Sequence, residues 1–138
     1  MAYLFDTNAI SEVFRRRPNE LFVAWLRTVP REDQYTTMLV LGELYTAAFR
    51  SVAKEKWLSR IEDAVIPTMS IVTMDLPTAR VYGEVRATLM GAGKPVADPD
   101  LQIAACALRY KLTLVTANVK HFERVPGLRL RAFSPGQQ

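Results

Sequence analysis

The sequence has little cysteine and no long apolar run. Its one cysteine, Cys106, rules out an intramolecular disulfide, and nothing in the chain suggests secretion. No apolar run approaches the roughly 20 residues that are needed to span a bilayer. Asp6 and Glu12 interrupt the N-terminus too early for a signal peptide. We therefore expect a cytoplasmic protein that has no membrane-spanning segment.

Motifs for nucleotide cofactors are absent as well. No G-x-G-x-x-G follows the first apolar run, and the chain has no Walker loop. The one histidine, His121, follows the last predicted buried strand, and we interpret it as an exposed or capping residue. The sequence therefore suggests neither a nucleotide cofactor nor a zinc site.

The composition is that of an ordinary globular protein. The 138 residues, 49% of them hydrophobic and 23% charged, are enough for one domain, which we place at residues 1–138. The net charge is +4, and the pI is about 9.5. This balance suits a polyanionic partner such as nucleic acid.

Short apolar runs alternate with helical patterns along the chain. This alternation is typical of an α/β fold, in which helices cover both faces of a mostly parallel sheet. We expect strands at residues 2–5, 35–37, 71–74, 113–116 and, at an edge, 128–133. Helices are expected at 10–16, 19–28, 38–50, 54–64, 77–90 and 100–110, with a short helix or turn at 118–124, a loop at 94–99 and a frayed tail at 134–138.

Three polar residues directly follow the first predicted strand: Asp6, Thr7 and Asn8. Open α/β sheets bind ligands beyond the carboxyl ends of their strands, so Asp6 is a candidate ligand-binding residue. The alternative is that Asp6 caps the next helix, a role that Thr7 or Asn8 could also fill. Thr116 and Asn118 end the fourth predicted strand in a similar way.

Three further acids lie on, or just before, predicted helices. Glu43 has apolar residues one turn before and after it, so it sits on or beside a buried face, where an arginine salt bridge is the alternative partner. Asp98 and Asp100 stand before or in the first turn of the apolar helix at 100–110. One of these two could cap that helix while the other points into the crevice.

Several carboxylates in one crevice would repel one another. Two unit charges about 4 Å apart interact by roughly 1 kcal/mol in water and by more near a protein surface. Protonation or a hard cation relieves this repulsion, and ligand sets made only of oxygen favour Mg²⁺ or Mn²⁺.

The order and spacing of several short segments are specific as a set. They are LFDTN at 4–8, GEL at 42–44, GKPV at 93–96 with DLQIAA at 100–105, and LVTAN at 114–118 with Phe122 and VPGL at 125–128. This set resembles the PIN-domain ribonucleases, specifically the VapC-type toxins of toxin–antitoxin pairs, over nearly the whole chain. The resemblance implies a three-layer sandwich whose five parallel strands are ordered 3-2-1-4-5.

The resemblance also implies an activity, which is Mg²⁺- or Mn²⁺-dependent endonucleolytic cleavage of RNA. Asp6 and Asp100 would be metal ligands. Glu43 would complete the cluster, either through a water or by orienting the attacking water. Asn118 occupies a fourth site at which some family members carry Asp, so this chain has one negative charge fewer there.

The same resemblance implies supporting roles and partners. Thr7 and Thr116 would hydrogen-bond the carboxylates or a metal-bound water. Asn8 is a further supporting residue, and Asp98 would be a helix cap or a support for the ligands. A homodimer is implied, together with an antitoxin segment that lies across the site and blocks it. Phe22, Trp25 and Trp57 could serve that partner, although core packing is the simpler interpretation.

Basic residues are candidate contacts for RNA phosphates. Arg15, Arg16, Arg17 and Arg86 are candidates for this role, and solvated helix charges are the alternative. Two other functions stay open: an RNA-binding or regulatory module with an inactive site, and a phosphatase that uses Asp6 as its nucleophile. Phosphatases of that type carry a second Asp two residues later, where this chain has Asn8.

Overall fold

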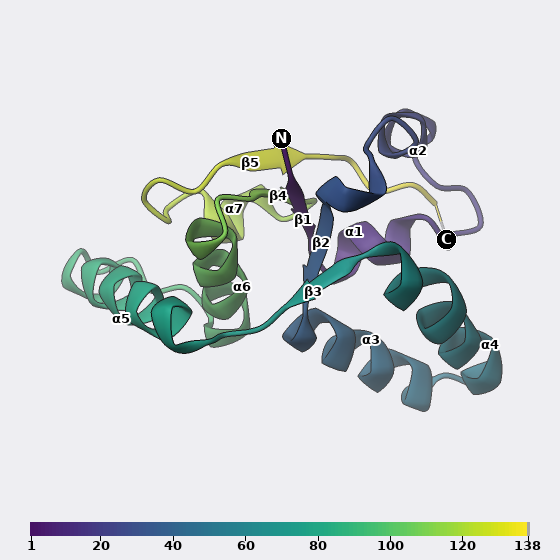
Figure 1. Cartoon of the computed structure of the whole chain (residues 1–138), viewed down its shortest axis with the longest axis horizontal. Helices are drawn as coiled ribbons and strands as arrows, with labels where there is room; N and C mark the ends of the chain where they lie inside the picture. Colours follow the sequence, from purple (N-terminus) through teal and green to yellow (C-terminus); the bar gives the residue numbers. More distant parts are fainter. Residues whose placement is uncertain (138) are drawn as a thin grey trace.

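A five-stranded sheet forms the centre of the molecule in a computed structural model that describes residues 1–137 (Figure 1). Its strand order is β3-β2-β1-β4-β5, and every neighbouring pair is parallel. The strands are β1 (Tyr3–Phe5), β2 (Gln34–Thr37), β3 (Ser70–Val72), β4 (Thr113–Thr116) and β5 (Leu130–Ala132). The expected α/β fold and strand order are confirmed.

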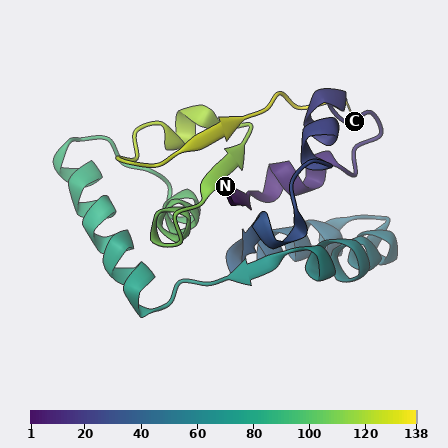
Figure 2. The same cartoon turned by 45° about the horizontal axis from the view of Figure 1, so that its top comes forward.

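Helices cover both faces of the sheet, because right-handed crossovers in opposite directions place their helices on opposite faces. One face carries α1 (Thr7–Glu12), α2 (Glu20–Leu26), α3 (Met38–Arg50) and α4 (Lys54–Ser59). The other carries α5 (Leu76–Gly91), α6 (Asp98–Arg109) and α7 (Val119–Phe122), and Figures 1 and 2 show the two groups on either side of the strands. Within residues 1–137, none of the helices has the length and apolarity that crossing a bilayer requires.

The core forms where the two central strands meet the helices. Leu4, Phe5, Leu114 and Val115 of β1 and β4 are at most 1% exposed. Consecutive residues are buried because helices cover both faces of a parallel sheet. On α6, Ala104 and its small neighbours are fully buried, so this helix packs closely against the sheet.

Two predicted helices begin earlier than expected. The helix predicted at 10–16 is α1, which starts at Thr7 because the Asp6 carboxylate, rather than Thr7 or Asn8, accepts the free N–H of Ala9 at 2.8 Å. Helix α6 starts at Asp98 because Pro99 fits the first helical turn, where its missing N–H costs no hydrogen bond. Both Asp98 and Asp100 therefore lie in the first turn of α6.

The helix predicted at 54–64 is α-helical only in its first part. The pattern at 54–64 gives α4 only as far as Ser59, and the chain continues as a π-helix over Arg60–Val65 and a 3₁₀ turn over Ile66–Thr68. A second 3₁₀ turn, Arg31–Asp33, precedes β2. By contrast, α3 and β4 have the bounds that the sequence predicts.

The C-terminal tail is not frayed where the structure describes it, because a buried carboxylate holds it. Glu12 is fully buried, and its Oε2 accepts the N–H groups of Asn19 and Gly136, each at 2.8 Å. A Cβ atom at position 136 would lie 2.2 Å from the Arg17 carbonyl oxygen, so only glycine fits there. The backbones of Arg17 and Gln137 pair as an isolated bridge, while Gln138 lies outside the described residues.

We expect Glu12→Ala to lower the free energy of unfolding by about 3 kcal/mol. The substitution removes the acceptor of two N–H groups and the partner of Arg15, whose Nε lies 2.9 Å from Glu12 Oε1. Urea denaturation in EDTA measures the change. Glu84→Ala, at an exposed position on α5, is the matched control and should stay within about 0.5 kcal/mol of the unsubstituted protein. Equal losses in the two variants would contradict this account.

Candidate active site

The candidate site lies at the carboxyl ends of the two central strands. Strands β1 and β4 are neighbours, with Phe5 opposite Val115 in the register. The crossovers from β1 and β4 lead in opposite directions, so the crevice of a doubly wound sheet falls between these strand ends. Asp6 follows β1 and Thr116 ends β4, so the two polar segments that end these strands are neighbours, as the strand order implied by the family resemblance requires.

The Asp6 carboxylate is largely shielded from solvent. It is 5% exposed. Burial raises the pKa of Asp6 above its ordinary value, while hydrogen bonds from the Thr116 hydroxyl and the Ala9 N–H act in the opposite direction. The negative charges of Asp100 and Glu43 raise this pKa further, which places all three carboxylates within electrostatic reach of one another.

Glu43 reaches the site from the middle of α3. Helix α3 begins directly after β2 and is capped by the Thr37 hydroxyl, which accepts the N–H of Val40 at 3.0 Å. Its buried face includes Leu41 and Leu44, and the half-buried Glu43 lies beside that face. The Thr7 hydroxyl donates to Glu43 Oε1 at 2.7 Å, so a residue next to Asp6 holds this carboxylate. Its partner is a hydroxyl and not the arginine that we considered.

Asp100 enters the site from the first turn of α6. Its Oδ2 lies 3.2 Å from Nδ1 of His121, which belongs to the short helix α7. The prediction that His121 is exposed is confirmed, but a histidine does lie beside one of the acids. One signal was available: His121 comes one helical turn after Asn118, at the end of a strand already expected to border the crevice.

Asn118 and Thr116 form the edge of the site on β4. Thr116 is fully buried, and its hydroxyl oxygen accepts the N–H of Asn118 at 2.9 Å. Asn118 occupies the N-cap position of α7 without capping it through its side chain, and it is half-buried. This neutral amide therefore follows β4 without adding negative charge to the site.

The donor set suits a hard divalent cation. Within residues 1–137, no three histidine, cysteine or acidic side chains converge closely enough to enclose a metal ion by themselves. Mg²⁺, however, usually keeps several waters and binds through one or two carboxylates. Asp6 and Asp100 would meet this requirement as direct protein ligands. Burial, together with the charges of Asp100 and Glu43, raises the pKa of Asp6, and a bound cation would offset both effects.

Other predicted site residues lie apart from this cluster. Asp98 accepts hydrogen bonds from the Tyr82 hydroxyl and, at 2.8 Å, from Gln102 Nε2. These bonds lower the pKa of Asp98, as does the charge of Arg86 on α5. Asp98 thus ties α5 to α6, and Asn8 is exposed on α1. Neither residue belongs to the electrostatic cluster around Asp6.

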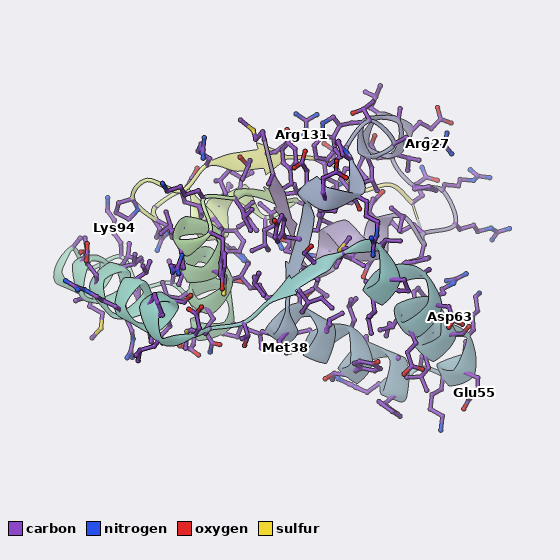
Figure 3. All side chains as sticks on the ribbon, viewed as in Figure 1. Arg27, Met38, Glu55, Asp63, Lys94 and Arg131 are labelled. Atoms are coloured by element: carbon purple, nitrogen blue, oxygen red, sulfur yellow. The ribbon has the colours of Figure 1, made fainter. Side chains whose placement is uncertain are left out.

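The four arginines proposed as RNA contacts differ in their side-chain environment. Arg15 pairs through Nε with Glu12, so a phosphate contact would use its other guanidinium nitrogens. Arg16, Arg17 and Arg86 are exposed, and their contact with RNA stays a prediction. Figure 3 places two further arginines, Arg27 and Arg131, on the same side of the molecule near α2.

An apolar groove lies on the face that carries α1 and α3, and none of the three carboxylates lines it. It has a volume of about 480 Å³ between α1, α3 and the π-helix. The Arg60 guanidinium lies over the rings of Phe14 and Trp57, 5.3 and 4.7 Å from their centres. Leu44 of α3 lines the groove and directly follows Glu43 in the chain. Of the aromatic residues proposed for a partner, Trp57 lines this groove, whereas Phe22 is buried in the core.

Fold and site together define a doubly wound α/β protein with a cluster of three carboxylates at the switch point of its sheet. The chain belongs to the PIN domain family, whose model matches residues 3–128. Toxin FitB of Neisseria gonorrhoeae is 36% identical over 86% of this chain and 89% of its own length. Ribonuclease VapC2 of Haemophilus influenzae is 31% identical over 94% of this chain and 96% of its own.

Solved structures support the same assignment. FitAcB from Neisseria gonorrhoeae matches with a TM-score of 0.86 and 32% identity, over 93% of this chain and 95% of that one. VapBC2 from Rickettsia felis, bound to a DNA fragment from its promoter, matches with a TM-score of 0.87 and 28% identity, over 97% of this chain and all of that one. The expected PIN membership is therefore confirmed.

We expect Asp6→Asn to raise the free energy of unfolding of the metal-free protein at pH 7. The pKa of Asp6 is higher in the folded protein than the ordinary 3.8, so its ionisation destabilises the fold as the pH rises through and above that value. Asparagine keeps the helix cap without the charge. Urea denaturation in EDTA at several pH values should show a gain at neutral pH that disappears below about pH 3.8.

Asp98→Asn is the matched control, because hydrogen bonds from Tyr82 and Gln102 lower the pKa of Asp98. Its ionised form stabilises the fold above the ordinary pKa, so the control should lose stability at pH 7. A loss of stability in Asp6→Asn as well would show that repulsion and burial do not dominate at Asp6.

Proposed function

We propose that this protein is a metal-dependent endoribonuclease that hydrolyses RNA phosphodiester bonds and acts as the toxin of a type II toxin–antitoxin pair. The observation that carries this proposal is the convergence of Asp6, Glu43 and Asp100 at the switch point of the sheet. Relatives named as ribonucleases support it, among them the tRNA(fMet)-specific endonuclease VapC of Salmonella typhimurium, 29% identical over 94% of this chain. We further propose that residues 1–138 act as one catalytic domain.

Asp6 and Asp100 would hold Mg²⁺ or Mn²⁺. A bound cation of this kind lowers the pKa of a water and offsets the charge that builds on the phosphorus oxygens. The protein arranges its ligands beforehand: the Ala9 N–H and Thr116 hydroxyl hold Asp6, and His121 contacts Asp100. Because these contacts already hold the two carboxylates, their side chains need little further ordering when the cation and the substrate bind.

Glu43 would orient the attacking water. Thr7 holds its Oε1, which leaves Oε2 to accept a hydrogen bond from that water. Asn118 would contribute an amide at the fourth position, and the exposed Asn8 could donate to the substrate. Arg15, Arg16, Arg17 and Arg86 would contact RNA phosphates, in keeping with a net charge of +4.

A protein antitoxin and a second copy of this chain are the proposed partners. The relative FitB is named as a toxin, and FitAcB and VapBC2 are solved structures similar to this chain. The apolar groove beside α3 provides a surface for an antitoxin segment, because it is lined by apolar residues such as Ile10, Leu44 and Ile61 and rimmed by Arg15, Arg16 and Arg60. A segment seated there could extend over Glu43 and block the site.

We expect antitoxin-free protein to cleave a structured RNA pool with Mg²⁺ or Mn²⁺ and not in EDTA. Asp6→Ala and Asp100→Ala should each lower the cleavage rate by more than about 100-fold, because replacing groups that merely support metal ligands already costs 10–100-fold. The amount of cleaved product over time, read from a denaturing gel, gives the rate.

Asp63→Ala is the control for these variants. Asp63 is exposed on the π-helix, and Figure 3 labels it on the opposite side of the molecule from α6, so the rate should not change. Cleavage that survives EDTA and both substitutions would sink the proposal. Metal-independent RNA binding with no cleavage would favour an inactive binding module, and hydrolysis of a small phosphate ester alone would favour a phosphatase.

Expression without an antitoxin should arrest the growth of a bacterial host. Wild-type protein destroys an RNA that the cell needs, whereas Asp100→Ala should let the cells grow although the same amount of protein accumulates. Growth curves with quantitative immunoblots test this. Equal arrest by both proteins would indicate toxicity that does not depend on the acidic cluster.

A further inference from the structure

A histidine that follows the last core strand contacts one of the three carboxylates. Nδ1 of His121 lies 3.2 Å from Oδ2 of Asp100. The two side chains come from different elements, because Asp100 is in the first turn of α6 and His121 is on α7. The contact is half open to water, with 59% of the His121 side chain and 26% of the Asp100 side chain exposed.

The backbone around His121 is firmly placed although the ring is exposed. The next residue, Phe122, is 2% exposed and belongs to the core. The His121 N–H donates to the Asn118 carbonyl at 3.0 Å, and the Thr116 hydroxyl accepts the Asn118 N–H. One short segment therefore connects Thr116, which supports Asp6, to His121, which contacts Asp100.

A contact at this distance is suited to orienting the Asp100 carboxylate. A carboxylate in the first turn of a helix can rotate about two side-chain bonds, and a metal ligand that rotates must be ordered when the ion binds. An Nδ1–H group that donates to Oδ2 limits this rotation and leaves the other oxygen available. Partners of metal ligands commonly act in this way, since their loss lowers metal affinity 10–100-fold.

We propose that His121 is a positioning residue that orients Asp100 for a divalent cation, an inference that rests on the proposed metal-dependent function. His121 acts through Asp100 and touches neither the ion nor the RNA. The role requires a hydrogen-bond donor at the place of Nδ1, which the amide of asparagine can supply. Glutamine is one methylene longer and places its amide nearer to the position of Nε2.

The test measures Mn²⁺ binding to antitoxin-free protein, from the paramagnetic resonance signal of the free ion and without RNA. We expect His121→Ala to weaken Mn²⁺ binding 10–100-fold. His121→Asn should restore affinity to within about threefold of wild type, whereas His121→Gln should resemble the alanine variant, because only asparagine replaces the Nδ1 donor. At saturating Mn²⁺, the His121→Ala variant should regain much of the cleavage rate that it loses at low Mn²⁺.

Two controls separate positioning from other roles. Thermal unfolding in EDTA should be the same for the wild type and all three variants, since a structural role would lower the midpoint. RNA binding in EDTA should also be unchanged. Mn²⁺ affinity that is equal in wild type and His121→Ala would overturn the inference, as would a loss of RNA binding with unchanged Mn²⁺ affinity. If His121→Ala fails to fold, the asparagine and glutamine variants still decide between the outcomes.

Asp100→Ala distinguishes failure of this inference from failure of the proposed function. If Asp100→Ala abolishes Mn²⁺ binding while His121→Ala does not affect it, only the role of His121 is wrong. If wild type does not bind Mn²⁺, or if Asp100→Ala binds it as wild type does, the assignment of Asp100 as a ligand falls and the role of His121 falls with it.

Discussion

The pairing of β1 with β4 is the contact on which the rest of this structure depends. Tyr3, Leu4 and Phe5 pair with Thr113, Leu114 and Val115, and the Asp6 N–H extends the ladder to the Val115 carbonyl at 3.4 Å. The crossovers diverge from this pair, so helices supplying Glu43 and Asp100 come from opposite faces of the sheet. A slip of one residue in this register would turn the buried side chains to the opposite face and separate Asp6 from Thr116.

The site is arranged at a cost in stability. Asp6 is buried as an acid near two others, and this raises its pKa. The surrounding groups compensate only in part: Ala9 and Thr116 hold Asp6, and Thr7 holds Glu43. Strain of this kind is common in sites that need charge at a particular place, because the fold tolerates local repulsion when its core is large. A divalent cation would relieve the same repulsion that the folded protein retains.

Glu12 illustrates a buried carboxylate with a different environment. It lies on the same short helix that Asp6 caps, yet it has two N–H donors and an arginine beside it. The Gly136 N–H donates to the Glu12 carboxylate, and this bond joins α1 to the C-terminal segment. Asp6 keeps its charge close to other acids, while Glu12 has its charge neutralised. Burial alone therefore does not distinguish these two acids; the charges of their neighbours do.

The sequence by itself determined the elements, the strand-end position of Asp6 and the placement of Glu43 and Asp100 on helices. These follow from local rules: apolar periodicity, caps and Pro positions act within a few residues, so α3 and β4 have the predicted bounds. The strand order itself came from a resemblance, since periodicity does not state which strands are neighbours.

Only the tertiary structure decided which side chains meet. The bond between Glu12 and Gly136 joins residues 124 positions apart, and His121 reaches Asp100 from another helix. Such contacts depend on the register of the sheet and the packing of its helices, and both arise only when distant parts of the chain bury their apolar surface together.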